Sequence, residues 1–419
     1  MEKKFTSANN IDMFYYPNAH THSFCLSLYI KAGVMYEEEK DNGITHFLEH
    51  MFFRNINHIM NGEMYRELDK RGLYFNGATY KEFMQLYIIG APKHFCAAFD
   101  ILSEVFKEIQ VPVEVLDTEA MRVKAEIREA DEYKTLDYFS GTHCWDGTSL
   151  SRTITGKAGN ISRFTRKKME EYRNSILTCD NVFFYVTGNV TDEDMNLIVN
   201  KAGELTVRSE KLNRSNEAPV PQNFGKRANS VYIKNSKNTI VQFSYDFVRT
   251  KYTYAELNVL YDILFSGENS LIHQELSEKR GMIYSYTSVM EKYSNIGRLY
   301  FTYEVKAKDL YDSIRIVKEA IENLSDSLEE WLEMVLPEYT DNAFMIYDDN
   351  EDFNWNRAYE NHIMGEKTKS IEETTCGFSE ITAGGIKKMA EEIFRQENLV
   401  LSIKGNKKKI DQERICECI

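Results

Sequence analysis

The feature that most constrains this chain of 419 residues is the pentapeptide His46-Phe47-Leu48-Glu49-His50. Two imidazoles four residues apart on a helix differ by about 40° in direction, so they share one face. Two neutral nitrogen ligands beside a carboxylate are what a hydrolytic zinc site needs, because the metal acidifies its water and the carboxylate takes the proton. The alternative is a helix that merely carries two histidines, since two histidines leave a zinc site incomplete.

A third ligand would complete such a site, and the segment from Asp117 to Glu129 supplies the candidates. Its pattern predicts a charged amphipathic helix in which Glu119 and Glu126 lie seven residues apart, two turns along one face. Glu129, one turn beyond Glu126, is the rival for the third position. Single glutamates on so charged a helix are usually solvated, so only the joint pattern with the histidines favours a role in the site.

With these residues together, the chain resembles the pitrilysin and mitochondrial-processing-peptidase family of zinc metallopeptidases. That family pairs His-x-x-Glu-His with a distal glutamate at a similar separation, preceded by a second glutamate seven residues earlier. The resemblance implies a Zn²⁺ ion bound by His46, His50 and Glu126. It also implies that Glu49 is the general base and that Glu119 supports the ligands from outside the coordination sphere.

The resemblance extends to a candidate substrate-binding strand. Residues 41–54 look like the family's approach to its zinc helix, and residues 72–79 look like an edge strand that usually carries Asn-Ala-x-Thr. The resemblance implies that a peptide adds to this edge through main-chain hydrogen bonds, with Asn76 nearest the cleaved bond and Ala78 beside it. Phe53 is predicted to line an apolar side-chain pocket, although burial in the core is an equal alternative.

One position departs from the family pattern. Residues 270–284 resemble the signature segment of the family's second domain, where an arginine commonly precedes a tyrosine by seven residues and both contact substrate backbone. Here Tyr284 is present, but Ser277 stands at the position of the arginine, and Arg280 is three residues out of place. Either a related partner chain supplies the arginine, or the arginine is dispensable or replaced by Arg280.

The expected fold class is α+β. The resemblance implies two similar domains, each a mostly antiparallel sheet packed with helices, that together form half of a clam-shell chamber. The predicted boundaries are 1–208 for the zinc-bearing domain and 228–419 for a second, homologous domain without the metal motif. Between them, residues 209–227 form a polar linker that carries two of the six prolines.

Composition narrows the partners and the compartment. A balance of 51 basic and 65 acidic residues gives a net charge of −14, which argues against nucleic acid or an anionic membrane as main partner. Seven scattered cysteines do not resemble a disulfide framework, and Cys416 and Cys418 are expected in a frayed tail. The chain has no apolar run long enough to span a membrane, so the cytoplasm is the expected location.

The predicted function is that of a zinc-dependent endopeptidase. It would cleave small or unfolded peptides, such as a leader peptide, inside a chamber formed with a homologous partner chain, with a heterodimer slightly favoured over a homodimer. The alternative is a non-catalytic or regulatory subunit of such a peptidase that binds peptide. Intact metal ligands favour catalysis, because degenerate subunits usually lose them.

Overall fold

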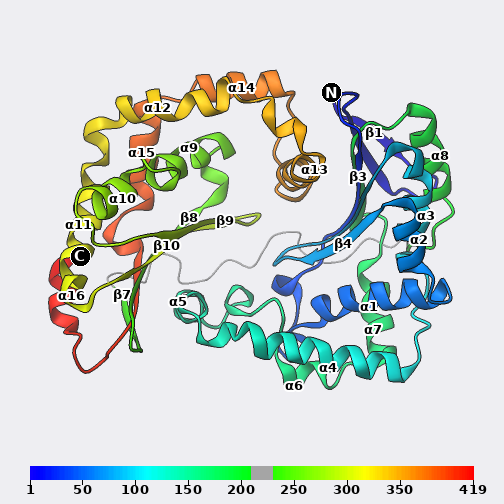
Figure 1. Ribbon diagram of the computed structural model, residues 1–419, viewed down its shortest axis with the longest axis horizontal. Coiled ribbons are helices and arrows are strands. Elements are labelled where there is room, and N and C mark those ends of the chain that lie inside the picture. Colours follow the sequence, from blue (N-terminus) through cyan, green and yellow to red (C-terminus); the bar gives the residue numbers. More distant parts are fainter. Residues whose placement is uncertain (209–229) are drawn as a thin grey trace. The chain divides into compact units, whose positions relative to one another are not determined.

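The computed structural model describes residues 1–208 and 230–419, with residues 230–232 described by their backbone alone. The chain packs into two compact units (Figure 1). Unit 1 comprises residues 1–131, 152–216 and 344–370, and unit 2 comprises residues 132–151, 217–343 and 371–419. The units therefore differ from the predicted linear domains in two segments, 132–151 and 344–370. The predicted linker, residues 209–227, lies outside the described residues.

Unit 1 is built on a six-stranded sheet in the order β1-β2-β6-β3-β5-β4. Its strands are β1 (Lys3–Thr6), β2 (Asp12–Pro17), β3 (Phe24–Ile30), β4 (Tyr74–Thr79), β5 (Met84–Gly90) and β6 (Val182–Gly188). Neighbouring strands are antiparallel except for β2 and β6. Strand β3 is buried along its whole length, because helices cover both faces of the sheet. Strand β4 lies at the edge.

Unit 2 is built on a five-stranded sheet in the order β7-β11-β8-β10-β9. Its strands are β7 (Ser230–Asn235), β8 (Thr239–Val248), β9 (Tyr286–Lys292), β10 (Ile296–Val305) and β11 (Leu399–Gly405). Only β7 and β11 run parallel. If β2–β6 and β7–β11 are each renumbered 1 to 5 along the chain, both sheets have the spatial order 1-5-2-4-3. In both sheets the first and last of these strands form the parallel pair. The predicted α+β fold of two similar, mostly antiparallel sheets is confirmed.

Helices surround each sheet. Those of unit 1 are α1 (Ile44–Ile59), α2 (Met64–Arg71), α3 (Phe95–Ser103), α4 (Val113–Ala130), α6 (Ala158–Ile161), α7 (Arg166–Ile176), α8 (Asp192–Ala202) and α13 (Asn350–Ala358). Those of unit 2 are α5 (Leu136–Cys144), α9 (Tyr254–Phe265), α10 (Leu271–His273), α11 (Leu310–Glu322), α12 (Leu328–Thr340), α14 (Ile371–Ser379), α15 (Ala383–Ile393) and α16 (Gln412–Cys418). None of the helices within residues 1–208 and 230–419 combines the length and the apolar character that a membrane span requires.

The sheet of unit 1 is covered on one face by α13, which comes from the second half of the sequence. Asn354 of α13 is fully buried against β3 and β6. Its Oδ1 accepts hydrogen bonds from the hydroxyls of Ser27 at 2.7 Å and Tyr29 at 3.0 Å. Its Nδ2 donates to the backbone carbonyl of Tyr185 at 3.0 Å. Neutral hydrogen bonds therefore fix this helix on the sheet.

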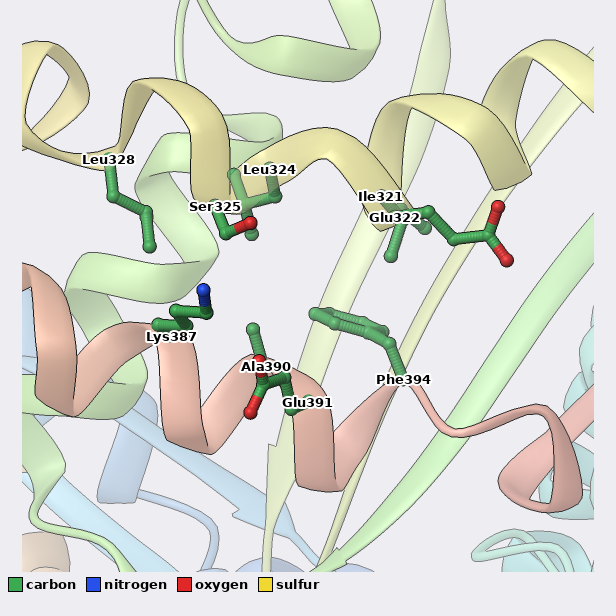
Figure 2. A pocket seen from close by; sticks show the side chains of 9 residues that line it. All are labelled: Ile321, Glu322, Leu324, Ser325, Leu328, Lys387, Ala390, Glu391 and Phe394. Carbon is green, nitrogen blue, oxygen red and sulfur yellow. The ribbon is translucent and has the colours of Figure 1, made fainter.

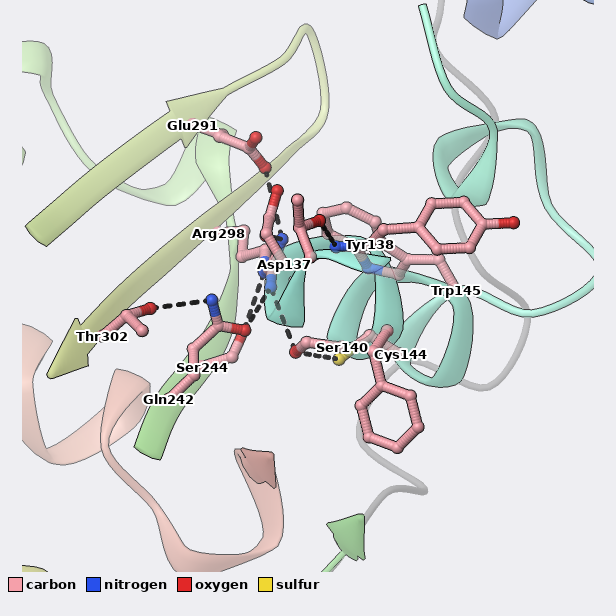
Figure 3. A network of polar contacts seen from close by, with 12 residues as sticks. Asp137, Tyr138, Ser140, Cys144, Trp145, Gln242, Ser244, Glu291, Arg298 and Thr302 are labelled. Atoms are coloured by element: carbon pink, nitrogen blue, oxygen red, sulfur yellow. Dashed lines mark hydrogen bonds and ion pairs between the residues drawn. The ribbon is translucent and has the colours of Figure 1, made fainter. Parts of the chain in front are cut away.

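The sheet of unit 2 is covered in the same way by α5, from the first half of the sequence. Arg298 of β10 is 2% exposed and meets Asp137 and Ser140 of α5 (Figure 3). Its Nη1 donates to Asp137 Oδ1 at 2.9 Å, and its Nη2 donates to Ser140 Oγ at 3.1 Å. On its own sheet, its Nε donates to Ser244 Oγ at 2.7 Å. A buried charge therefore fixes α5 on the sheet.

The C-terminal segment does not have the structure expected from the sequence. Residues 412–418 form α16, and Ile415, Cys418 and Ile419 are at most 5% exposed within the core of unit 2. The predicted frayed tail is wrong, because these three side chains recur at helical spacing and give the segment an apolar face to bury. All seven cysteines are free, as expected for a chain without a disulfide framework.

Unit 2 also contains a cavity of about 230 Å³ between the α11–α12 connection and α15 (Figure 2). Its wall is mainly apolar, with three charged side chains among the lining residues, which are Ile321, Glu322, Leu324, Ser325, Leu328, Lys387, Ala390, Glu391 and Phe394. None of the candidate metal ligands is among them.

Candidate metal centre

The start of α1 is fixed by a buried carboxylate. Gly43 precedes the helix with φ of 100°, a left-handed conformation that favours glycine. Glu37, 6% exposed, accepts hydrogen bonds from the backbone N–H groups of Gly43 at 2.8 Å and Thr45 at 2.9 Å. A carboxylate at a helix N-terminus is stabilised by the helix dipole. The backbone is thereby anchored immediately before His46.

Helix α1 lies alongside α4 (Figure 1), and this pairing brings the predicted ligands together. His46 Nε2 is 3.5 Å from Glu126 Oε1, and His50 Nε2 is 3.5 Å from Glu126 Oε2. The ligand atoms of the three residues all lie within 4.8 Å of one another. Both distances of 3.5 Å are longer than ordinary hydrogen bonds, and the three ligand atoms lie close enough together to share one ion. Glu129, the rival ligand, is exposed and is not part of this group.

These residues fit a zinc ion. Two ligands that are each 2.0–2.1 Å from a tetrahedral zinc are roughly 3.4 Å apart, close to the observed separation. Two imidazole nitrogens and one carboxylate form a donor set typical of hydrolytic zinc sites, which keep a further position for water or substrate. The geometry therefore supports the predicted set of His46, His50 and Glu126, whose metal binding stays a prediction.

Glu119 lies behind His50. It is 2% exposed, and its Oε1 is 2.9 Å from His50 Nδ1. Arg54 Nε donates to its Oε2 at 2.5 Å, and Arg122 Nη1 donates to the same oxygen at 3.0 Å. A carboxylate that holds Nδ1 fixes the ring and directs Nε2 toward the metal position. The contacts thus suit the predicted role of Glu119 as a support for His50.

The charges of the cluster follow from these contacts. Burial raises the pKa of Glu119, but the hydrogen bonds with His50 and Arg54 outweigh it and bring this pKa to about 2. Burial lowers the pKa of His50, but Glu119 and Glu126 outweigh it and raise this pKa to about 9. The facing imidazoles of His46 and His50 hold the pKa of Glu126 well below its usual range. A cation at Nε2 competes with the proton of His50, so metal affinity is expected to rise with pH.

Glu49 points from α1 to the edge of the sheet. It is 8% exposed, and its Oε2 accepts a hydrogen bond of 2.5 Å from Thr79 Oγ1 at the end of β4. The sequence placed Thr79 on the predicted edge strand but did not connect it with Glu49, and Arg54 was not predicted as a member of the site. Arg54 follows His50 by one helical turn, a spacing that could have indicated it. Thr79 reaches Glu49 through long-range packing, for which the sequence carries no local signal.

The predicted substrate residues of unit 1 lie on or beside β4. Asn76 and Ala78 belong to this edge strand, whose outer side is unpaired among the described strands. Asn76 Oδ1 accepts a hydrogen bond of 2.9 Å from the Gly77 N–H. Phe53 of α1 is half-buried and packs against Phe75 with ring centroids 4.7 Å apart. These positions are compatible with peptide binding along β4, which stays a prediction.

The predicted substrate residue of unit 2 is Tyr284, which is 96% exposed. Ser277 lies in a single π-helical turn, Gln274–Glu278, that continues α10. Arg280 forms an ion pair with the Glu275 side chain and donates to its backbone carbonyl at 2.8 Å. Arg280 is therefore engaged locally, and its replacement of the missing arginine stays a prediction.

Comparison with known families covers most of the chain. Residues 13–158 match the model described as insulinase, peptidase family M16, and residues 163–332 match the model described as peptidase M16 inactive domain. Both the metal motif and Glu126 lie in the first match. The second match begins within unit 1, at residue 163, and continues through strands β7 to β10 of unit 2, which carry no such motif.

Two relatives found by sequence similarity are described as a zinc protease and as a subunit of a processing peptidase. An "uncharacterized zinc protease YmxG" from Bacillus subtilis is 22% identical over 406 residues, which cover 95% of this chain and 97% of that protein. The human mitochondrial-processing peptidase subunit beta is 27% identical over 173 residues, 41% of this chain and 35% of that protein.

Two solved structures share the fold. A Helicobacter pylori protease has a TM-score of 0.84 at 16% identity, covering 97% of this chain and 99% of that one. The periplasmic protease PqqL from Escherichia coli has a TM-score of 0.82 at 15% identity, covering 100% of this chain but 49% of that one. From both family models and these relatives, the chain belongs to the insulinase family of peptidases, peptidase family M16.

Proposed function

We propose that this chain is a zinc-dependent endopeptidase that cleaves small or unfolded peptides. One observation carries the proposal: α1 and α4 bring His46, His50 and Glu126 around a common point, with Glu49 one helical turn from His46. The relative from B. subtilis that spans nearly the whole chain is also named a zinc protease.

The residues of unit 1 have separate tasks in this proposal. His46, His50 and Glu126 hold Zn²⁺, which when bound polarises the scissile carbonyl and acidifies water. Glu49 accepts the proton of the attacking water and returns it to the leaving amine. The outer edge of β4 binds the peptide through main-chain hydrogen bonds near Asn76 and Ala78, a mode with modest sequence demand.

We further propose that this chain forms one half of a closed chamber and that a homologous partner chain forms the other half. The chain matches about half of PqqL, a single protein roughly twice as long, which supports a working unit of two such halves. Ser277 stands at the place of an expected substrate-binding arginine, which favours a heterodimer whose other chain carries that arginine. The cytoplasmic location stays a prediction, since PqqL is described as periplasmic.

The alternative is a non-catalytic subunit that binds peptide without cleaving it. Ser277 is the observation that favours it, because the isolated chain would lack a group that contacts substrate. The two functions differ in their requirement for zinc, because a non-catalytic subunit needs no zinc, whereas the peptidase does.

The test combines metal analysis with peptide cleavage. The protein is purified from its native host with any bound chain, its mass is measured, and quenched fluorescent peptides are added. Glu49→Gln should keep zinc and abolish cleavage, because an amide cannot accept the proton. Glu114→Gln, an exposed change on α4, should leave both unchanged. Zinc-free protein without cleavage would favour the silent subunit, and full turnover by E49Q would refute Glu49 as base.

A further inference from the structure

We infer that Thr79 is the positioning residue of the general base, and that it joins Glu49 to the strand on which the peptide lies. The inference rests on the proposed function and adds a residue to it. It starts from the 2.5 Å hydrogen bond between Thr79 Oγ1 and Glu49 Oε2. That length is typical of a charge-assisted bond from a hydroxyl to a carboxylate.

The bond makes the two oxygens of the Glu49 carboxylate unequal. Glu49 is 8% exposed, so few water molecules can satisfy its carboxylate. Because the Thr79 hydroxyl takes one acceptor site of Oε2, Oε1 is the less engaged oxygen and the favoured acceptor of a proton from the attacking water. A glutamate has three side-chain torsions, and a donor at one oxygen restricts the last of them. Thr79 therefore holds the base in one orientation.

Thr79 is itself held rigidly. It is the last residue of β4 and pairs with Met84 of β5. The hairpin closes immediately beyond it, where the Tyr80 N–H donates to the Phe83 carbonyl at 2.8 Å. Sites placed on regular elements keep their geometry better than sites on loops. The same strand that is proposed to bind the peptide backbone thus also orients the base.

The competing explanation is that the hydroxyl only satisfies a buried carboxylate and contributes to stability. The two explanations differ in what Thr79→Val changes. Valine keeps the β-branched shape that suits a strand, but it cannot donate a hydrogen bond. A positioning role lowers kcat and leaves KM and zinc content unchanged, whereas a purely structural role lowers stability without changing turnover by folded enzyme.

The chain offers a matched control. Thr6 is the last residue of β1, the opposite edge strand of the same sheet, and its hydroxyl donates to Asp12 Oδ1 at 2.9 Å. Thr6→Val therefore removes a hydroxyl–carboxylate bond from an edge strand, far from the base in the strand order. It should change neither kcat nor KM.

The experiment measures kcat, KM and zinc content for the full complex carrying T79V, Thr79→Ser, T6V or E49Q. For T79V, kcat should fall roughly ten- to a hundredfold, the usual effect of losing one hydrogen bond to a charged group. KM and zinc content should stay within about twofold of their original values, and T79S should recover most of kcat because it restores the hydroxyl. A crystal structure of T79V should show the Glu49 carboxylate in another orientation.

Several results would overturn the inference. Unchanged kcat in T79V, a T79S variant as slow as T79V, or a loss explained by missing zinc would each do so. If E49Q is inactive while T79V is fully active, the inference fails and the proposed peptidase stands. If E49Q turns over like the unaltered protein, the proposed base fails, and the inference fails with it.

Discussion

The sheets of unit 1 and unit 2 share the order of five strands, but the helix that follows β3 in unit 1 and the helix that follows β8 in unit 2 bury different kinds of side chain. In unit 1 this helix is α1, whose buried residues include His46 and Glu49. In unit 2 it is α9, whose buried residues, among them Leu257, Leu260 and Ile263, are all apolar. The two units thus share the order of five strands, but the helix after the second of these strands buries site residues in unit 1 and apolar residues in unit 2. The fold is a scaffold, and the chemistry depends on the residues placed on it.

The units also differ in how they hold the helix that comes from the other half of the sequence. Unit 1 binds α13 through the neutral amide of Asn354, whereas unit 2 binds α5 through the guanidinium of Arg298. Both contacts lie on the face of the sheet opposite its main helical layer. In both units a buried polar side chain holds this helix, but it is a neutral residue of the helix in unit 1 and a charged residue of the sheet in unit 2.

The largest expected effect comes from disabling the candidate metal centre of unit 1, which has no counterpart among the described residues of unit 2. Glu126→Gln removes the anionic ligand and should weaken zinc binding by more than about a hundredfold, because even residues behind the ligands cost ten- to a hundredfold. Glu129→Gln, one turn away and exposed, should bind zinc normally. Isothermal titration measures both. The opposite result would make Glu129 the third ligand.

The next effect tests the charged contact of unit 2. Arg298→Met should lower the free energy of unfolding by about 3 kcal/mol, because it removes a buried cation and its hydrogen bonds to four side chains, those of Asp137, Ser140, Gln242 and Ser244. Trp145, whose ring lies 5.1 Å from the Arg298 guanidinium, reports the transition by fluorescence. Arg315→Met is the control, since Arg315 is 51% exposed and its ion pair with Asp312 is worth little. Equal loss in both variants would contradict this account.

A smaller effect is expected behind the metal ligands. Glu119→Gln weakens the hold on His50 Nδ1 and should lower zinc affinity ten- to a hundredfold, less than E126Q. The matched change Glu114→Gln lies on the same helix but is exposed. Competition with a zinc-binding dye gives the affinities. Normal zinc binding by E119Q would show that the contact with His50 does not support the metal site.

The smallest effect concerns the neutral contact of unit 1. Asn354→Leu keeps the size of the side chain but leaves the Ser27 and Tyr29 hydroxyls without their acceptor, and should cost about 2 kcal/mol of unfolding free energy. Asn356→Leu, a partly exposed change on the same helix, should cost less. Urea titrations compare both with R298M. A larger loss for N354L than for R298M would reverse the ranking of neutral and charged contacts.

The sequence alone predicted the local features of the site. His46, Glu49 and His50 could be placed on one helical face, and Glu119 and Glu126 on another, because helical periodicity depends only on spacing along the chain. The family resemblance carried by these residues likewise predicted two similar α+β units. Such patterns can be recognised in the sequence because each depends on residues that are only a few positions apart.

Tertiary structure decided what those faces meet. The packing of α1 against α4 brought Glu126, the third ligand that the family resemblance implied, to the two histidines, and only the closure of the sheet brought Thr79 to Glu49. The exchanged segments 132–151 and 344–370 and the buried α16 were likewise beyond local patterns. These contacts join residues far apart in the chain, and their free energy depends on burial in the assembled core, which spacing along the sequence does not express.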